Sequence, residues 1–348
     1  MKKFLALISI VVMTVGCATS PQNAEQSTPK DKKNLPPLNT QDTVVDAAGN
    51  RHFCSNGNPI FRHEHTADPA ALVYNDTIWL FAGRDFKGDN GNGYVMKDWV
   101  MFSTTDMVHW TEYPIPLTVD DFAWDNSHSA WASQVIPRNG KFYWYTSTNW
   151  CGIGVAVSDK ITGPYKDAIG KPLVTTEEHC KASKHAWASI DPTVFIEDDG
   201  QAYLIWGNSQ CYICKLKENM TELDGEPSQI LFEGDNKFTE APWIYKYNGK
   251  YYLAYASDWP EKIAYAVSDK IEGPYKCLGI ISEIAGNCNT THPAIINYKG
   301  QWIFISHNGG LPDGASFSRS VIAEYMTIHP DGTIDKIHPS SEGVRLDN

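Results

Sequence analysis

Apolar and aromatic residues recur along the chain in five similar segments. Each segment has a small or proline-containing start, a few apolar residues, a turn with Gly or Asp, and then an aromatic-rich run. Strand-forming residues on both sides of a tight turn are typical of a β-hairpin. The five predicted hairpins begin at Asp68, Ala132, Asp191, Ala241 and His292.

A second pattern supports the same repeat. The segment AVSDKITGPYK that begins at Ala156 recurs as AVSDKIEGPYK from Ala266, whereas helical periodicity is scarce. Repeats of about fifty residues, each with roughly four short strands, are typical of a β-propeller. The sequence therefore predicts an all-β fold, a five-bladed β-propeller. A β-sandwich would not explain the repeat, and a parallel β-helix would need a much shorter one.

The N-terminus has the pattern of a secretory signal. Lys2 and Lys3 precede the apolar run Phe4–Val15, which is too short to span a bilayer as a stable helix, and Cys17 follows. We interpret residues 1–17 as a lipoprotein signal peptide, with Cys17 as the acylated first residue of an outer-membrane lipoprotein that faces the periplasm or the cell surface. Ordinary cleavage, which would release a soluble periplasmic protein, is the alternative.

Residues 18–50 are polar and contain few large apolar side chains. Such a segment cannot bury enough apolar surface to order itself, so we predict a flexible tether. Residues 51–348 then form the propeller domain, and roughly 300 residues are enough for one sizeable core.

Charge and composition narrow the class of partner. The net charge of −12 argues against nucleic acid, because phosphate binding needs clustered Lys and Arg. It also argues against a surface held on anionic lipid by charge, so that membrane contact is expected only through Cys17. The 12 Trp and 17 Tyr supply flat faces for sugar rings, although most will lie in the core. A neutral carbohydrate is the partner that fits best.

Acidic residues occupy corresponding positions of the repeats. Asp68, Asp191 and His292 each start the first strand of a repeat, and Glu240 lies one residue before that position. Alone, an Asp-Pro pair is most often a structural turn. In a propeller, however, equivalent first strands surround one central channel. Carboxylates gathered there raise one another's pKa, which costs stability unless the site uses it. These four residues therefore predict a functional site.

The five segments resemble successive blades of glycoside hydrolase family 43. The resemblance runs from about Asn58 to Ile337 and rests on the motifs HTADPAALVYNDTIWLFAG, SAWASQVIPRNGKFYWYTS, SIDPTVFIEDDGQAYLIWG, FTEAPWIYKYNGKYYLAYAS and THPAIINYKGQWIFISHNG. They look closest to members that remove arabinofuranose or xylose from arabinoxylan and related chains. The resemblance implies an inverting enzyme in which Asp68 is the general base, Asp191 tunes pKa and orientation, and Glu240 is the general acid.

Inversion places two physical demands on these carboxyls. Asp68 and Glu240 should stand roughly 6.5–9.5 Å apart, which leaves room for the attacking water. Glu240 must hold a proton near neutral pH. We expect its apolar neighbours at 241–243 and the charge of Asp191 to raise its pKa.

Other positions of the family pattern imply substrate contacts. Trp131 and Ala132 match the wall of the first sugar subsite, and Arg319 matches an arginine that reaches ring hydroxyls and the acids. The alternatives are a blade-packing role for Trp131 and a rim salt bridge for Arg319. Ile190 stands where related retaining enzymes that act on fructans carry arginine, and we expect it at the substrate. Phe86, in a long insert, is expected to shape the pocket.

His292 matches an axial histidine that, in some relatives, helps hold a hydrated calcium ion in the channel. The resemblance therefore implies Ca²⁺ with His292 as its protein ligand. Calcium prefers oxygen ligands, so one imidazole is weak evidence for such a site. A hydrogen-bonding role for His292 is the alternative.

The expected function is exo-hydrolysis of plant cell-wall polysaccharide such as arabinoxylan or arabinan, by a monomer, with release of terminal arabinofuranose or xylose. Two long inserts, Lys87–Asp98 and Asp120–His128, could block one end of the pocket and so favour exo action. An endo-arabinanase of the same family is one alternative. A non-catalytic surface glycan-binding lipoprotein is another, but it would need the aromatic residues and not the acids.

Overall fold

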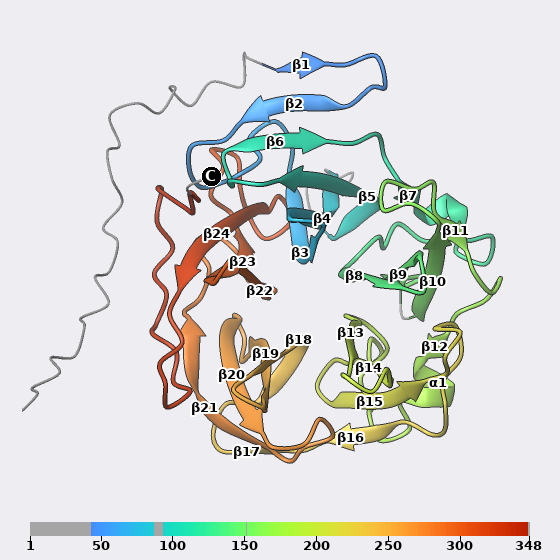
Figure 1. Ribbon diagram of the computed structural model, residues 1–348. Helices are drawn as coiled ribbons and strands as arrows, with labels where there is room; N and C mark the ends of the chain where they lie inside the picture. The colour runs from blue at the N-terminus through green and yellow to red at the C-terminus, as the bar shows by residue number, and fades with distance from the viewer. Residues whose placement is uncertain (1–42, 87–92, 151, 347–348) are drawn as a thin grey trace, which may run out of the picture. The chain divides into compact units, whose positions relative to one another are not determined.

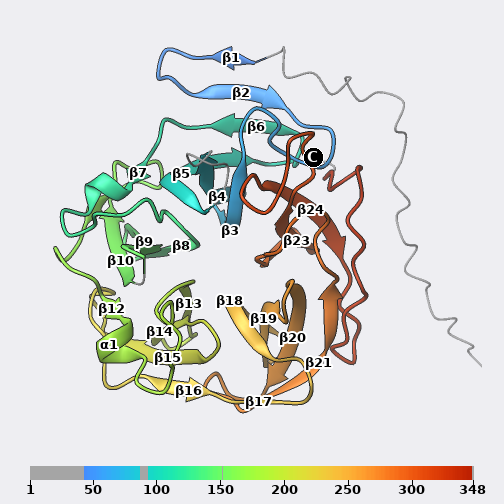
Figure 2. The ribbon, with the colours of Figure 1, turned by 180° about the vertical axis from the view of Figure 1, so that it is seen from behind.

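The strands of this protein form a β-propeller. The computed structural model describes residues 43–86, 93–150 and 152–346. Its described strands make five sheets around a common axis, as Figures 1 and 2 show from opposite sides. In each sheet the strand that comes first in the hairpin lies nearest the axis (Figure 1).

The sheets follow one another along the chain. The first contains β1 (Val44–Val45), β2 (Arg51–Cys54), β3 (Thr66–Tyr74), β4 (Thr77–Phe86), β5 (Val95–Thr104), β6 (His109–Glu112) and β7 (Leu117–Thr118). The second contains β8 (Ser133–Arg138), β9 (Lys141–Thr148), β10 (Gly152–Ser158), β11 (Lys166–Asp167) and β12 (Val174–Thr175). The third contains β13 (Thr193–Ile196), β14 (Ala202–Trp206), β15 (Cys211–Leu216) and β16 (Ser228–Ile230).

The fourth sheet contains β17 (Phe232–Glu233), β18 (Phe238–Tyr247), β19 (Lys250–Ser257), β20 (Lys262–Ser268) and β21 (Tyr275–Ser282). The fifth contains β22 (Ala294–Tyr298), β23 (Gln301–Asn308) and β24 (Ser320–Met326). Short helical turns lie at α1 (Thr176–His179) and at a 3₁₀ segment, Val119–Asp121. Among the described residues, no helix has the length and apolar character needed to cross a membrane.

The predicted all-β propeller is confirmed, and so are the five hairpins. They are the antiparallel pairs β3–β4, β8–β9, β13–β14, β18–β19 and β22–β23. The number of blades differs from the prediction. Four sheets reach the four strands of a complete blade, whereas β22–β24 make only three in the described part of the chain. The structure thus has four complete blades and not five.

The boundary of the folded domain also needs correction. Val44 and Val45 lie within the predicted tether, yet they form β1 and pair with β2 at the outer edge of the first sheet. The Asp46 carboxylate accepts backbone N–H groups of Ala48 and Asn50, both at 2.9 Å, and so fixes the turn between the strands. The predicted signal peptide, Cys17 and most of the tether lie outside the described residues.

Aromatic residues of the second strands fill the space between neighbouring sheets. Trp144 of β9 is fully buried, and its ring centroid lies 5.0 Å from that of Phe81 in β4. Such aromatic pairs contribute about 0.5–1.5 kcal/mol beyond the area they bury. Because these strands are covered on both faces, they carry nearly continuous apolar runs; β14, for example, is buried at every position. The aromatic-rich half of each repeat therefore joins one sheet to the next.

Candidate active site

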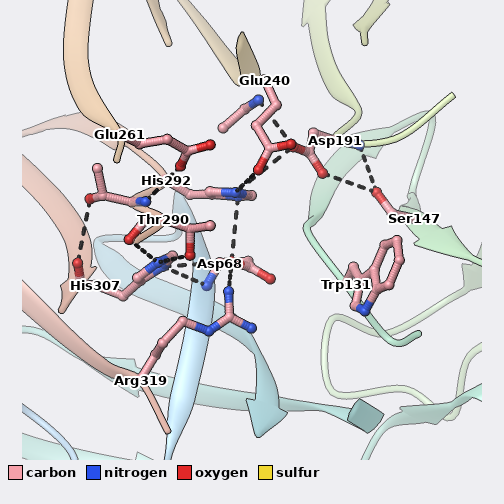
Figure 3. A network of polar contacts seen from close by, with 12 residues as sticks. Asp68, Trp131, Ser147, Asp191, Glu240, Glu261, Thr290, His292, His307 and Arg319 are labelled. Atoms are coloured by element: carbon pink, nitrogen blue, oxygen red, sulfur yellow. Dashed lines mark hydrogen bonds and ion pairs between the residues drawn. The ribbon is translucent and has the colours of Figure 1, made fainter. Parts of the chain in front are cut away.

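The backbone of the site adopts an unusual conformation at three positions where sheets begin near the axis. Asp68, Asp191 and Ala241 have φ angles of 52°, 60° and 57°. This left-handed region is uncommon for residues other than glycine and persists only where surrounding contacts hold it. The pairing register shifts beside Asp68 and Ala241. A bulge of this kind redirects a side chain, and Figure 3 shows Asp68, Asp191 and Glu240 converging.

These side chains surround one cavity that opens to solvent. Seven of the predicted site residues line it together with Tyr94, Trp187 and Thr290: Asp68, Trp131, Ile190, Asp191, Glu240, His292 and Arg319. Two predicted residues are not part of the lining. The ring of Phe86 is covered by Arg84 and Lys97, because the end of β4 points it toward these cations. Ala132 is buried, and its carbonyl accepts the Ser147 backbone N–H.

Asp68 is paired with a buried cation. Arg319 Nη1 donates to Asp68 Oδ1 at 2.7 Å, and its Nε and Nη2 donate to the Asp85 carboxylate at 2.9 and 2.8 Å. All three side chains are almost completely buried. Burial alone would lower the pKa of Arg319, but the charges of Asp68 and Asp85 raise it well above its usual value. A buried ion pair is tolerated when hydrogen bonds satisfy both partners, and this fork of donors meets that condition.

Asp191 lies farther from a cation than Asp68 does. Its Oδ2 accepts the Ala241 backbone N–H at 3.0 Å and lies 3.8 Å from His292 Nε2, and its Oδ1 accepts the Ser147 hydroxyl at 3.5 Å. Burial raises the pKa of Asp191 to about 8; the charge of His292 opposes this rise, and the charges of Glu240 and Asp68 add to it. Asp191 therefore holds its proton more strongly than an ordinary carboxyl.

The pKa of Glu240 is lowered, which corrects the prediction that it would be raised. Burial does raise it, as expected from the apolar neighbours. A hydrogen bond to His292 Nε2, 3.4 Å from Glu240 Oε1, and the charge of that ring outweigh burial. Glu261 and Asn208 add further hydrogen bonds that favour the carboxylate. Polar groups brought from distant loops, absent from the local sequence, decide the direction.

His292 connects the two halves of the site. Its Nδ1 lies 3.5 Å from Asp68 Oδ1, while its Nε2 faces Glu240 and Asp191 (Figure 3). Burial lowers the pKa of an imidazole, but the charges of Asp68 and Asp191 and the contact with Glu240 raise that of His292 to about 9. The ring is therefore an imidazolium at neutral pH and compensates part of the negative charge of the cavity.

A directly bound calcium ion fits these residues poorly. One ligand atom each from Asp191, Glu240 and His292 lies within 4.8 Å of the others, close enough for a metal. Calcium, however, takes six to eight oxygen ligands. An ion here would take most of its oxygen ligands from water, as the expected hydrated calcium ion does. Calcium at His292 stays a prediction, and no step of the chemistry below uses a metal.

Tryptophans form one wall of the cavity. Trp131 is 8% exposed; its backbone carbonyl accepts the Trp99 indole N–H at 2.7 Å, and its own indole N–H donates to the Tyr94 carbonyl at 3.3 Å. The Trp187 ring lies 5.4 Å from that of Trp131 and is 41% exposed at the mouth of the cavity. Trp131 thus both packs between sheets and faces the pocket. Trp187 was missed from the sequence, although it stands only four residues before Asp191.

A fourth acid, Glu261, was also missed. It is 1% exposed in the turn between β19 and β20, and its Oε2 accepts the Thr291 backbone N–H at 2.8 Å. Burial and the charge of Glu240 raise the pKa of Glu261 well above its usual value. Nothing in the repeat pattern marks it, because it belongs to a turn and not to the start of a blade.

Comparisons with known proteins agree with this geometry. The family described as "Glycosyl hydrolases family 43" matches residues 56–334. A xylosidase/arabinosidase from Humicola insolens is 30% identical over 334 residues, which cover 79% of this chain and 98% of the relative. A solved α-L-arabinofuranosidase from Clostridium thermocellum is 34% identical, with a TM-score of 0.68 over 82% of this chain and 98% of its own. A β-xylosidase/α-arabinofuranosidase from a compost metagenome, solved with xylotriose in a calcium-free form, is 26% identical, with a TM-score of 0.73 over 83% and 99% of the two chains.

Proposed function

The chain belongs to glycosyl hydrolase family 43, and from this premise we propose that it is an inverting exo-glycosidase that removes terminal arabinofuranose or xylose from plant cell-wall polysaccharide such as arabinoxylan or arabinan. One observation carries the proposal. Three carboxyls from three sheets, Asp68, Asp191 and Glu240, meet in one small cavity beside a tryptophan wall. The names of the relatives support the choice of sugars.

Asp68 is the general base in this proposal. Arg319 Nη1 donates to its carboxylate at 2.7 Å, and His292 Nδ1 lies 3.5 Å from the same oxygen, so both hold the carboxylate in place. A water molecule between Asp68 and the anomeric carbon loses its proton to this carboxylate as it attacks. The His292 ring contacts both Asp68 and Glu240 through its two nitrogens, at 3.5 and 3.4 Å. We propose that this interposed ring keeps the two carboxyls at the roughly 6.5–9.5 Å that an inverting pair requires.

Glu240 is the general acid, and its proton comes from the acid cluster. The pKa of Asp191 is raised to about 8 and that of Glu261 well above its usual value, so both hold a proton more strongly than an ordinary carboxyl. Interacting carboxyls titrate together, so that proton belongs to the cluster more than to one residue. A glycosidic oxygen placed against Glu240 displaces the His292 hydrogen bond that lowers its pKa. The proton then moves to Glu240, which donates it to the leaving oxygen.

The lining of the cavity supports exo action over the endo-arabinanase alternative. Tyr94 belongs to the insert at 87–98 that is expected to block one end of the pocket, and it lines the cavity. Trp131 and Trp187 offer apolar faces on which a terminal sugar ring can stack. A non-catalytic glycan-binding lipoprotein would use this wall but would have no need for the buried acids.

The remaining parts of the proposal rest on the sequence. We propose that residues 1–17 are a lipoprotein signal peptide, that Cys17 is acylated, and that the following polar segment tethers a monomeric enzyme to the outer membrane, facing the periplasm or the surface. We also propose that the three-stranded sheet β22–β24 serves as the fifth blade, since its hairpin repeats the pattern of the other four.

Pentose release tests the proposal directly. The purified protein without residues 1–17 is incubated with nitrophenyl α-L-arabinofuranoside and nitrophenyl β-D-xyloside, alongside Glu240→Gln and the exposed control Glu226→Gln. Release that persists in the control and disappears in Glu240→Gln is the expected result, with an inverted anomer observed by NMR. Silence on both substrates, with arabinan or arabinoxylan still bound, would reject exo action in favour of an endo-acting or binding role.

A further inference from the structure

Two aspartates of the site have their backbone held by a side chain from the sheet before them. The Asp68 N–H donates to His307 Nδ1 at 3.1 Å, and the Asp191 N–H donates to Ser147 Oγ at 2.6 Å. Figure 3 shows His307 beside Asp68 and Ser147 beside Asp191. Both acceptors are completely or almost completely buried, so no solvent competes for these hydrogen bonds.

His307 and Ser147 occupy equivalent places in the fold. Each is the last residue but one of the eight-residue second strand of its hairpin, in β23 and β9. Each strand passes the start of the next sheet around the ring, at Asp68 and at Asp191 respectively. The same function is therefore carried by two different residue types at one repeated position.

Among the five starts of the repeats, the left-handed backbone occurs only where a side chain accepts the N–H. Ala241, the third left-handed residue of the site, donates its N–H to Asp191 Oδ2 at 3.0 Å, because Gly207, at the position equivalent to His307 after β14, carries no acceptor. At the same position, β4 has Gly83 and β19 has Ala256, neither of which carries an acceptor. The repeats that follow these two strands begin at Ala132 and His292, and neither residue has a positive φ.

A non-glycine residue leaves the left-handed region unless its surroundings hold it there. The hydrogen bond to the N–H does so, because relaxation of φ would turn this buried donor away from its acceptor and leave it unpaired. The direction of the Asp68 and Asp191 side chains follows from this backbone angle. A side chain that fixes the angle thus fixes where the carboxyl points.

We propose that His307 and Ser147 are positioning residues for the reaction, His307 for the base Asp68 and Ser147 for Asp191 and, through it, the acid Glu240. This inference rests on the proposed function. It assigns His307 one tautomer. Nδ1 accepts from Asp68, and Nε2, which lies 3.0 Å from the Thr290 carbonyl, carries the hydrogen.

A protonated ring would present an N–H to the Asp68 N–H. The charged or titratable groups that face His307 are Arg319, His292 and the Asp68 carboxylate. Burial, followed by the charges of Arg319 and His292, lowers the pKa of His307 well below its usual value. The ring therefore stays neutral and able to accept at every pH at which the enzyme is expected to act.

The two residues should affect opposite halves of the reaction. Loss of the acceptor at His307 misplaces the base Asp68, so that substrates with good and with poor leaving groups both react slowly. Azide needs no base. It should therefore restore turnover by attacking the anomeric carbon as the aglycone departs. Loss of the acceptor at Ser147 misplaces Asp191 and, through it, the acid Glu240. Its effect should be larger for a disaccharide, whose leaving oxygen needs a proton, than for a nitrophenyl glycoside.

The test compares His307→Leu, which lacks the acceptor, with His307→Asn, whose Oδ1 can replace Nδ1. We expect kcat to fall on the order of 100-fold in His307→Leu with little change in KM, since a misplacement of about 1 Å has this effect. His307→Asn should recover at least about tenfold of that loss, and azide should accelerate His307→Leu but not the wild type. Equal activity of the Leu and Asn variants, or a loss confined to KM, would overturn the role of His307.

Ser147→Ala tests the other half with a small change that the buried site can accommodate. We expect its loss on xylobiose or arabinobiose to exceed that on the nitrophenyl glycoside by about tenfold, a part of the roughly 10²–10⁴-fold that general acid–base catalysis contributes. Equal losses on the two substrates would overturn its assignment.

Crystal structures of His307→Leu and Ser147→Ala provide a readout that needs no activity. Residues 68 and 191, respectively, should leave the left-handed region; unchanged φ angles would reject the positioning role. If the wild type releases no pentose, the proposed function fails, and these structures still decide the inference.

Discussion

Asp68 and Asp191 begin two sheets in the same way, yet their surroundings differ. Both precede a proline, both are left-handed, and both donate their N–H to a side chain of the preceding sheet. Asp68 meets the guanidinium of Arg319, whereas Asp191 meets a backbone N–H, the Ser147 hydroxyl and the His292 ring. Burial raises the pKa of Asp191 to about 8, and no guanidinium offsets it there. Equivalent positions of a repeat thus acquire different chemistry from what lies opposite them, as pairs of catalytic carboxyls generally do.

The strongest test of this difference replaces Asp68 in one variant and Glu240 in another. Asp68→Asn should lower kcat by on the order of 10³–10⁴ on nitrophenyl and disaccharide substrates alike, because the base is needed whatever the leaving group. Glu240→Gln should lose as much on a disaccharide and distinctly less on the nitrophenyl glycoside. Steady-state kinetics on both substrates measures the contrast, with the exposed Glu226→Gln as control. Similar leaving-group dependence in the two variants would contradict the assignment of base and acid.

Removal of the cation from the Asp68 half should cost stability. Arg319→Met leaves the Asp68 and Asp85 carboxylates buried without their partner, which is expected to destabilise the fold by about 3–5 kcal/mol. Urea unfolding measures the change, and the exposed Arg345→Met provides the matched control. The double variant with Asp85→Asn should regain part of the loss. If Arg319→Met has the same free energy of unfolding as the wild type, the ion pair with Arg319 does not explain the difference between Asp68 and Asp191.

The pH dependence of the free energy of unfolding tests the charge of the His292 ring, which lies between Asp68 and Glu240. The pKa of His292 is raised to about 9 in the folded protein from 6.5 in a free imidazole. Its contribution to folding should therefore be complete below pH 6.5 and disappear as the pH rises to about 9. The total change is on the order of 3 kcal/mol. The free energy of unfolding, measured from pH 6 to 9.5, should decline over this window in the wild type.

His292→Gln provides the comparison, because it keeps a polar side chain that cannot titrate. The difference in free energy of unfolding between wild type and variant should narrow steadily with rising pH. A constant difference across the window would show that His292 is neutral in the folded protein.

The smallest effect is expected at Glu261, on the side of Asp191 and Glu240. Because Glu261 is neutral, Glu261→Gln keeps the oxygen that accepts the Thr291 N–H and should change stability by less than about 1 kcal/mol. It removes a proton from the acid cluster, so the alkaline limb of kcat/KM should move to lower pH. Glu261→Ala, which also loses the hydrogen bond, separates the two contributions. An unshifted pH profile in Glu261→Gln would exclude Glu261 from the cluster.

The sequence by itself determined the architecture and the three carboxyls. The repeat is local: alternating strands, tight turns and aromatic runs can be recognised in each segment without knowledge of its neighbours. Asp68, Asp191 and Glu240 followed because equivalent blade starts must meet at the axis of a propeller. Trp131, His292 and Arg319 were likewise predicted, and the cavity includes all of them. The same local pattern did not predict how many strands the last sheet has. It also did not predict β1, because that strand forms only by pairing with β2 at the edge of the first sheet.

Only the tertiary structure decided how these residues are charged and held. Arg319 and Asp68 are 251 positions apart, and His307 and Asp68 are 239 apart, because both contacts form where the ring closes. Asp85, Glu261 and Asn208 lie outside the repeated positions, yet they set the balance of charge. The predicted pKa of Glu240 was wrong for this reason. The local segment indicates that Glu240 is buried, but the hydrogen bonds that oppose the effect of burial come from residues distant in sequence, Asn208, Glu261 and His292.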